Sequence, residues 1–417
     1  MPSYGFGAMS VPAREGLICA QTSGSITKMN AFEKMLTAPR VLATVREINQ
    51  QPAAWGETCA RVVAMAEEIR SFLHRETGAD AGCRTIILTG AGSSEYVGRS
   101  IEGALRRRLA TEVVTVPTTH FLTHCDSVFL PRRDYLLVSF ARSGDSPESV
   151  ATFQRVADRF PRVRQAVITC NRDGGLARLA AESRGCLRIL LPDQTNDTSL
   201  AMTSSFSSLA LAGLSLGFMD VPESLPPVVE RAMAGARRVL GEYGDLLSDF
   251  ACLPFTRACY LGSNTLLGCT QEARLKMQEM TAGRVASAFD SFLGLRHGPQ
   301  VFVNGECVVV ASLSSNPSVR RYERDLLREL RNKKQGIGTL VICGRAEREI
   351  RELSSAVIEL YPAEEPLDDD YRVLTDIVAC QILAVFKSVE LGLSPDNPSP
   401  DGIINRVVEG ITVYPWA

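Results

Sequence analysis

The sequence predicts an α/β protein with two similar domains, each a mainly parallel sheet flanked by helices. First, the same series of landmarks occurs twice, about 171 residues apart. Second, the apolar runs are short, rich in β-branched residues and free of alternation, which is typical of strands buried on both faces. Third, helical segments separate these runs, and this arrangement favours a parallel sheet covered by helices.

Each landmark of the first copy has a partner in the second. An apolar run that ends in a turn of small residues occupies 85–94 and again 258–264. A second run with its polar turn occupies 135–143 and again 307–315. The remaining pairs are Gly98 with Gly268, Glu102 with Glu272, 167–170 with 340–343, Pro192 with Pro362, and the helical segments 200–219 with 371–391.

These pairs divide the chain into five parts. Apolar residues between 62 and 73 recur at helical spacing outside the duplication and predict a helical N-terminal element. In order along the chain, we expect this element at 30–80, a first domain at 81–221, a helical linker at 222–250, a second domain at 251–393 and a C-terminal tail at 394–417.

The composition excludes several classes of protein. A hydrophobic content of 45% with 22% charged residues is ordinary for a soluble globular protein, and a net charge of −2 argues against a broad nucleic-acid surface. The longest apolar stretch, 209–219, is far shorter than the ~18 residues of a membrane span, and no signal peptide is evident. The 12 cysteines lack zinc spacing and favour reduced thiols in the cytoplasm. We expect no metal and no cofactor.

Two turns in the first copy, at 90–94 and 141–146, predict an anion site. Each follows a strand and precedes a helix, whose free N–H groups favour negative charge, and serine hydroxyls add further donors. Neither is a nucleotide-binding motif, because Glu95 replaces the last glycine of the dinucleotide fingerprint. Each serine could also be an ordinary helix cap. A third hydroxyl-rich stretch occupies 195–208, and the candidate phosphate-binding residues are Gly92, Ser93, Ser94, Arg142, Ser143 and Ser146.

The stretch 265–300 predicts the acid–base groups. Glu272, Lys276 and Glu279 lie three or four residues apart, on one face of a predicted helix. His297 follows in a loop marked by glycine and proline. A cation, a carboxylate and a histidine are what proton transfer on an anionic substrate requires. Taken alone, Lys276 could be solvated and His297 structural, and Asp368–Asp370 is interpreted as a solvent-exposed acidic turn.

With these motifs in view, the chain resembles the sugar isomerase (SIS) domain family. The matching segments are GAGSS, ARSGDSPES, NDTSLAMTSSFSSLAL, and EARLKMQE with RHGP. The paired layout is similar to the isomerase half of glutamine:fructose-6-phosphate amidotransferase. Still more similar is the tagatose-6-phosphate ketose/aldose isomerase or galactosamine-6-phosphate deaminase subfamily, through REINQQPAAW at 46–55, DSFLGLRHGP at 290–299 and NRVVEG at 405–410. The resemblance covers about residues 30–415.

The resemblance implies roles for the candidate residues. The serines would hold a sugar phosphate, Glu279 would be the enolisation base, and Lys276 would lie near the ligand. His297 would open the sugar ring in a neighbouring subunit, which implies a homodimer or higher homo-oligomer with shared active sites. Two positions depart from the amidotransferase, Ala141 at a phosphate-binding serine and Glu409 near a lysine that joins the open sugar. A lysine–imine step is therefore not carried over.

The expected reaction is the release of ammonia from an aminosugar phosphate. The chain starts Met1-Pro2, its first cysteine is Cys19, and too few residues precede the first domain for a glutaminase. We therefore expect D-galactosamine 6-phosphate to yield D-tagatose 6-phosphate and ammonium, by enolisation and imine hydrolysis. Two alternatives stay open: aldose–ketose isomerisation of hexose 6-phosphates without deamination, and a non-catalytic sugar-phosphate sensor.

Overall fold

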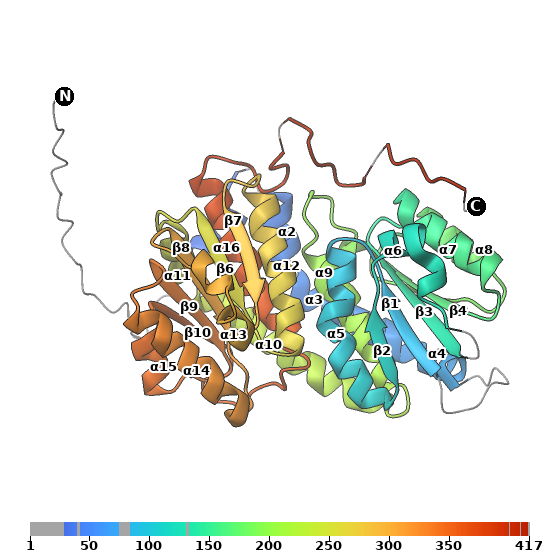
Figure 1. Ribbon diagram of the computed structural model, residues 1–417, viewed down its shortest axis with the longest axis horizontal. Helices are drawn as coiled ribbons and strands as arrows, with labels where there is room; N and C mark the ends of the chain where they lie inside the picture. The colour runs from blue at the N-terminus through green and yellow to red at the C-terminus, as the bar shows by residue number, and fades with distance from the viewer. Residues whose placement is uncertain are drawn as a thin grey trace.

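The computed structural model describes residues 29–39, 42–74, 84–130, 133–399, 401–408 and 410–415. In these ranges the chain forms two parallel five-stranded sheets that lie side by side, each covered by helices (Figure 1). The predicted class, an α/β protein with two similar sheets and helices before the first of them, is confirmed.

The first sheet has the strand order β2-β1-β3-β4-β5. The order reverses between β1 and β3, which is where ligands bind in open sheets of this kind. The strands are β1 (Arg84–Thr89), β2 (Glu112–Thr115), β3 (Asp134–Ala141), β4 (Arg164–Thr169) and β5 (Leu187–Leu190). The helices that alternate with them are α5 (Ser93–Leu109), α6 (Thr118–His124), α7 (Pro147–Arg159), α8 (Gly175–Glu182) and α9 (Ser204–Ser215).

The second sheet repeats this topology, because its order β7-β6-β8-β9-β10 matches the first strand for strand. Its strands are β6 (Arg257–Leu261), β7 (Ala286–Asp290), β8 (Cys307–Ser312), β9 (Gly338–Cys343) and β10 (Ala356–Glu359). Its helices are α12 (Thr265–Met280), α13 (Phe292–Leu295), α14 (Pro317–Asn332), α15 (Arg348–Leu353) and α16 (Val373–Glu390).

Further helices lie before the first sheet and between the two sheets in the chain. Before β1 come α1 (Ala31–Leu36), α2 (Ala43–Asn49), α3 (Gln51–Ala64) and α4 (Ala66–His74); between the sheets come α10 (Leu225–Glu242) and α11 (Gly244–Ala251). Short 3-10 turns occupy Cys125–Ser127, Asp193–Thr195, Leu216–Phe218, Pro222–Ser224 and Pro299–Phe302. Within the described ranges, no helix has the length and apolar character that a membrane span requires.

Two helices, α5 and α12, join the sheets. They pack against each other between the two domains (Figure 1). Gly268 makes the close approach possible, because a Cβ there would lie 2.5 Å from backbone atoms of Arg99 and Ser100 on α5. One apolar cluster continues through this contact from Ile101 on α5 to Met277 on α12 and Ile377 on α16. The two sheets therefore share one core.

The C-terminal tail crosses the top of the molecule in Figure 1, from the second sheet to the first. Its described residues form neither helix nor strand. Asp396 anchors it, because its carboxylate accepts hydrogen bonds from the backbone N–H groups of Ala43 and Thr44 at the start of α2. Glu409 lies outside the described residues.

Candidate active site

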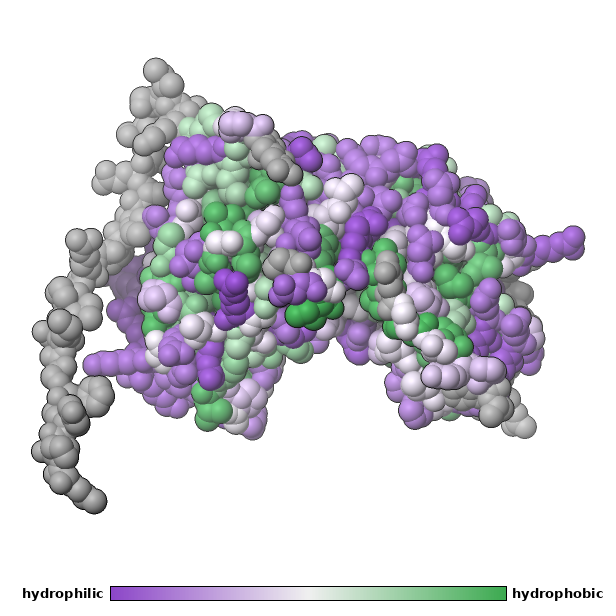
Figure 2. All heavy atoms as spheres, turned by 90° about the horizontal axis from the view of Figure 1, so that it is seen from above, coloured by the Kyte–Doolittle hydropathy of each residue, from purple (hydrophilic) through white to green (hydrophobic). Residues whose placement is uncertain are grey.

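A cavity of about 900 Å³ lies where the tail passes over the ends of β1 and β3. Four of the predicted site residues line it: Gly92, Ser93, Arg142 and Glu279. Tail residues between 399 and 408 form another part of the lining. Figure 2 views the molecule from the side of the tail, where hydrophobic residues lie in several patches. The cavity thus combines groups from both copies of the duplication and from the tail.

The turn after β1 presents the start of α5 to this cavity. Gly90 permits the tight turn, because a Cβ there would lie 2.4 Å from the backbone of Ser94. Gly92 has a φ of 57°, in the region that favours glycine, and Ser93 begins the helix. A helix of 17 residues directs a partial positive charge at its start. The turn is therefore suited to an anion.

Three ionisable side chains of α12 form a cluster beside Ser93, and two of them, Lys276 and Glu272, contact its hydroxyl. The ammonium of Lys276 donates to Ser93 Oγ at 3.1 Å and to Glu279 Oε2 at 2.5 Å, and lies 3.2 Å from Glu272 Oε1. Ser93 Oγ in turn donates to Glu272 Oε1 at 3.0 Å. Lys276 and Glu272 are fully buried, whereas the Glu279 side chain is 23% exposed. The reading of Lys276 as a solvated residue is therefore wrong.

Burial and the charges within the cluster shift the pKa values of Glu272 and Lys276. Burial raises the pKa of Glu272 to about 7, although Lys276 opposes the shift. The second carboxyl oxygen of Glu272 is buried with no hydrogen-bond partner among the described residues. Burial alone would lower the pKa of Lys276, but Glu272 and Glu279 together outweigh it and raise that pKa. The spacing of α12 predicts Glu272 on the same helix face as Lys276, but its contact with Ser93 was not predicted.

Three arginines, Arg142, Arg284 and Arg406, line the cavity without a carboxylate partner among the described ion pairs, and Arg142 and Arg406 contact each other. Arg142 is 7% exposed and donates to the carbonyl oxygens of Leu200 at 2.9 Å and of Arg406 at 2.6 Å. Arg406 donates to the Asp197 carbonyl at 2.8 Å. Burial, and then the charge of Arg406, lowers the pKa of Arg142. Their charges are not neutralised, so an anion in the cavity would be favoured. Arg406 belongs to the NRVVEG motif at 405–410 but was not assigned to the site, because no local pattern places the tail over this cavity.

Three predicted serines lie beside the cavity lining rather than in it. Ser146 caps α7 by accepting from the N–H of Ser149 at 3.3 Å. Ser143 accepts from the N–H of Asp145 at 3.3 Å. Ser94 is buried, and its hydroxyl lies 3.9 Å from the sulfur of Met202, which lines the cavity. Their contact with a phosphate remains a prediction.

His297 lies away from the cavity of its own chain. Arg284 lines the cavity, and the five-residue strand β7 then carries the chain about 16 Å away from it. His297 follows α13 in an exposed turn, and Figure 1 shows α13 toward the bottom of the view. Within one chain, His297 and Glu279 are not brought together.

The hydroxyl-rich stretch 195–208 turns its hydroxyls inward. Glu47 accepts from the N–H and hydroxyl of Thr198 at 2.6 and 2.9 Å, and Asp197 accepts from the hydroxyl of Ser205 at 2.6 Å. Gln51 and Trp55 both bind the hydroxyl of Ser207, at 2.7 and 2.9 Å. Residues of the motif at 46–55 thus hydrogen-bond this loop and fix its position. Leu200 and Met202 of the loop line the cavity. The prediction of a third hydroxyl donor set for an anion is wrong.

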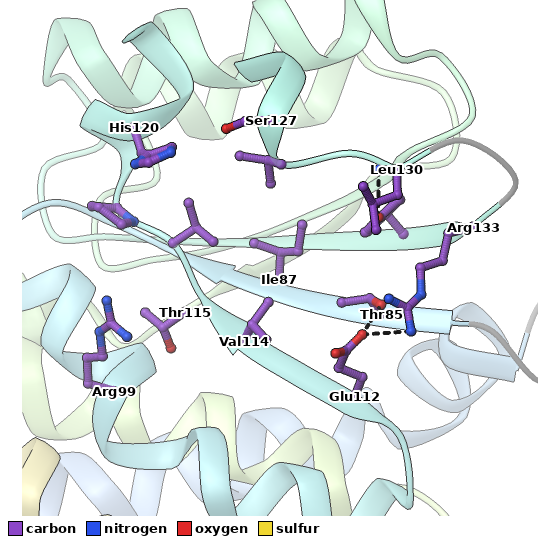
Figure 3. A pocket seen from close by; sticks show the side chains of 14 residues that line it. Thr85, Ile87, Arg99, Glu112, Val114, Thr115, His120, Ser127, Leu130 and Arg133 are labelled. Carbon is purple, nitrogen blue, oxygen red and sulfur yellow. Dashed lines mark hydrogen bonds and ion pairs between the residues drawn. The ribbon is translucent and has the colours of Figure 1, made fainter. Parts of the chain in front are cut away.

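A second cavity, of about 430 Å³, lies against β1 and β2 of the first sheet (Figure 3). Ile87 and Val114 form part of its floor, and Glu112 is already paired with Arg133 at 2.9 Å. None of the predicted site residues lines it. The part of the chain that the structure describes contains no cluster of three or more residues suited to a metal ion.

The chain is similar to known proteins over most of its length. A D-galactosamine-6-phosphate deaminase AgaS of Shewanella sp. strain ANA-3 is 35% identical over 390 residues, which is 92% of this chain and 94% of the relative. The solved tagatose-6-phosphate ketose/aldose isomerase of Escherichia coli is 31% identical, with a TM-score of 0.81 over 92% of this chain and 99% of that one. A solved protein of Clostridium novyi NT is 32% identical, with a TM-score of 0.85 over 90% and 95%. No protein-family model matches the chain.

Identity at this level over nine-tenths of both chains accompanies the same two-sheet fold. The chain therefore belongs to the sugar isomerase (SIS) family, with the D-galactosamine-6-phosphate deaminases named AgaS.

Proposed function

We propose that this protein converts D-galactosamine 6-phosphate and water to D-tagatose 6-phosphate and ammonium. The observation that carries the proposal is Glu279, a partly exposed carboxylate that lines the cavity while Lys276 holds one of its oxygens at 2.5 Å. A carboxylate held in this way can move a proton between adjacent carbons. The name of the relative from Shewanella supports the choice of substrate.

The reaction needs one base and one water molecule. Glu279 takes the proton from C2 of the open-chain aminosugar, and the electron pair forms a double bond between C1 and C2 while the C1 oxygen is protonated. Return of a proton to C1 leaves an imine at C2. Water adds to the imine carbon, ammonia leaves, and the 2-ketose remains. Lys276 orients Glu279 throughout, since it binds Oε2.

The phosphate is anchored away from the reacting carbons. The start of α5 at Ser93 supplies N–H groups, and Arg142 and Arg406 supply positive charge that no described ion pair neutralises. Ser94, Ser143 and Ser146 are assigned as further contacts. Binding energy from a remote group can hold C1 and C2 in position for proton transfer.

Ring opening is assigned to His297 of a second subunit. His297 is exposed and lies at the far end of β7 from the cavity of its own chain. A homo-oligomer with shared sites would bring it to the cavity of a neighbour. The ten described cysteines are free, which favours the reducing cytoplasm as the compartment.

The decisive experiment is a coupled assay for ammonia with D-galactosamine 6-phosphate, together with identification of the ketose. The proposal expects equal amounts of ammonium and D-tagatose 6-phosphate, and deuterium at C1 of the product in heavy water. Galactosamine without phosphate should lose about 10²- to 10⁴-fold in kcat/KM, because two or more charge-assisted hydrogen bonds are lost.

Plain isomerisation is the second candidate, supported by the name of the Escherichia coli isomerase. It predicts interconversion of D-tagatose 6-phosphate with its aldose and no ammonia from the aminosugar. Ammonia release at a rate far below that interconversion would replace the first proposal by the second.

A further inference from the structure

The second sheet repeats the two turns that face the active site. We call residues 90–92 and 142–146 the first cradle, after β1 and β3. Residues 262–264 and 313–316 follow β6 and β8, at the same reversal of strand order, and form the second cradle. The two cradles lie at opposite ends of α12. Thr265 begins this helix beside the second cradle, and Glu279, beside the first, is about 21 Å further along it.

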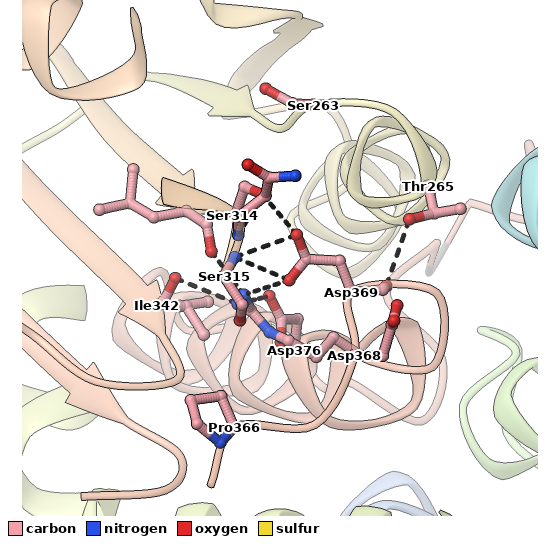
Figure 4. Close-up of polar contacts among 12 residues, drawn as sticks. Ser263, Thr265, Ser314, Ser315, Ile342, Pro366, Asp368, Asp369 and Asp376 are labelled. Carbon is pink, nitrogen blue, oxygen red and sulfur yellow. Dashed lines mark hydrogen bonds and ion pairs between the residues drawn. The ribbon is translucent and has the colours of Figure 1, made fainter. Parts of the chain in front are cut away.

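We infer that Asp369 is a built-in anion that fills the second cradle, at the place where the first cradle would take a phosphate ester. Its carboxylate accepts hydrogen bonds from the N–H of Ser315 at 2.9 and 3.0 Å and from the hydroxyl of Ser314 (Figure 4). The preceding helix is held as well, because Thr265 Oγ donates to the backbone carbonyl of Asp369 at 3.2 Å. A backbone N–H and a serine hydroxyl are the donors that bind phosphate elsewhere.

A second carboxylate takes two further donors of the second cradle. Glu323, on α14, is fully buried. It accepts from the hydroxyl of Ser263 at 2.7 Å and from the N–H of Ser314 at 2.8 Å. The second cradle is thus occupied by carboxylates of the protein itself, whereas the first borders an open cavity.

A buried cation completes the comparison with an anion site. Arg372 is fully buried and pairs with Asp369 at 3.2 Å and with Asp376 at 2.7 Å. The hydroxyl oxygen of Ser315 is buried and has no hydrogen-bond partner among the described residues. Without the side chain of Asp369, the guanidinium of Arg372, the N–H of Ser315 and the hydroxyl of Ser314 would each lose an acceptor. A phosphate monoanion there would restore the charge that the carboxylate now supplies.

The acidic turn is therefore not solvated as predicted. Asp369 is mostly buried, and Asp370 is 7% exposed and pairs with Arg107 on α5. Only Asp368 is exposed. The turn therefore contacts the second cradle through Asp369 and contacts α5, the helix that begins at the first cradle, through Asp370.

The test replaces Asp369 by alanine and uses inorganic phosphate as the probe. Equilibrium unfolding is measured in chloride and in phosphate at equal ionic strength, and equilibrium dialysis counts bound phosphate. Phosphate should shift the unfolding equilibrium of Asp369→Ala at least about tenfold more than that of the wild type, at a concentration about ten times the Kd. Dialysis should find one more phosphate per chain than in the wild type.

Asp368→Ala is the matched control, because this carboxylate belongs to the same turn but accepts only from the N–H of Asp370 among the described bonds. It should bind phosphate as the wild type does. Adding Glu323→Gln to Asp369→Ala should tighten phosphate binding further, because it removes a negative charge beside the same donors.

An unchanged phosphate count and an equal phosphate effect in Asp369→Ala would overturn the inference and leave Asp369 a structural residue. If that variant does not fold in chloride, refolding is compared in phosphate and in chloride. Recovery in phosphate alone supports the inference, and equal failure in both contradicts it. The inference rests on the proposed function only in taking phosphate as the ligand of the first cradle. Binding is measured without turnover, so loss of the proposed deamination would be seen separately.

Discussion

The first and second cradles have matching positions in matching sheets, but different groups face them. Beside the first cradle, Ser93 meets Lys276 and a cavity of about 900 Å³. Ser314 and Ser315 of the second meet the carboxylate of Asp369. Two turns of matching geometry are therefore not enough to make an anion-binding site. The donors must also be left free.

The helices across from the cradles differ in the same way. The spacing that pairs Gly98 with Gly268 pairs Arg106 with Lys276 and Leu109 with Glu279. Glu272 has the counterpart Glu102, which accepts from the N–H of Thr115 at 2.9 Å and lies on a partly exposed face. The second cradle thus has no unoccupied space for an anion, because Asp369 fills it. It also has no carboxylate opposite it, because Leu109 stands where α12 has Glu279.

The largest effect is expected when the first cradle loses its base and so becomes like the second. Glu279→Gln should lower kcat by about 10²- to 10⁴-fold, because a positioned general base contributes about that much. Calorimetry with the sugar phosphate should find binding changed by less than about threefold. Glu95→Gln, a carboxylate on α5 that pairs with Arg99, is the control and should keep full activity. Near-normal turnover by Glu279→Gln would remove that residue from the reaction.

A second test compares Glu272, which is fully buried, with its partly exposed counterpart Glu102, and asks whether burial raises the pKa of Glu272. The pKa of Glu272 is raised from 4.5 to about 7, so the folded state holds its proton longer than the unfolded state. Its stabilising contribution is complete below pH 4.5 and is lost as the pH rises to 7, by up to about 3 kcal/mol in the free energy of unfolding.

Denaturant unfolding at several pH values checks this expectation. Glu272→Gln should flatten the dependence on pH between 4.5 and 7, whereas Glu102→Gln should keep the slope of the wild type. Equal slopes for the wild type and Glu272→Gln would mean that the carboxyl of Glu272 is ionised across this range.

The smallest effect concerns Arg142, whose counterpart in the second cradle is Ser314. Arg142→Gln removes a charged donor from the carbonyls of Leu200 and Arg406 and should raise KM about 5- to 30-fold, with a smaller change in kcat. Arg406→Gln should behave alike, and the double variant should cost less than the sum if both act on one phosphate. Arg188→Gln, on β5, is the control. An unchanged KM in both single variants would separate the arginines from the ligand.

Much of the fold could be predicted because the duplication repeats its signals. Apolar runs of β-branched residues identified the central strands, and the turns after β1 and β3 followed from their glycines and serines. The edge strands β2 and β7 were not predicted, because four or five residues without a long apolar run carry too little local signal.

The site was predictable where its residues share one element. Lys276 and Glu279 lie one turn apart on α12, so their spacing alone brings them together. Partners from distant segments were not predictable in this way. Glu47 meets Thr198, and Arg142 meets Arg406, through folding that no local pattern encodes. The same holds for Asp369, whose burial depends on a turn that looks solvated in the sequence.

The packing of α5 against α12 makes the two halves of the duplication depend on each other. Under the proposed function, the turn that holds the phosphate precedes α5 and the base lies on α12, so each half of the duplication supplies only part of the site.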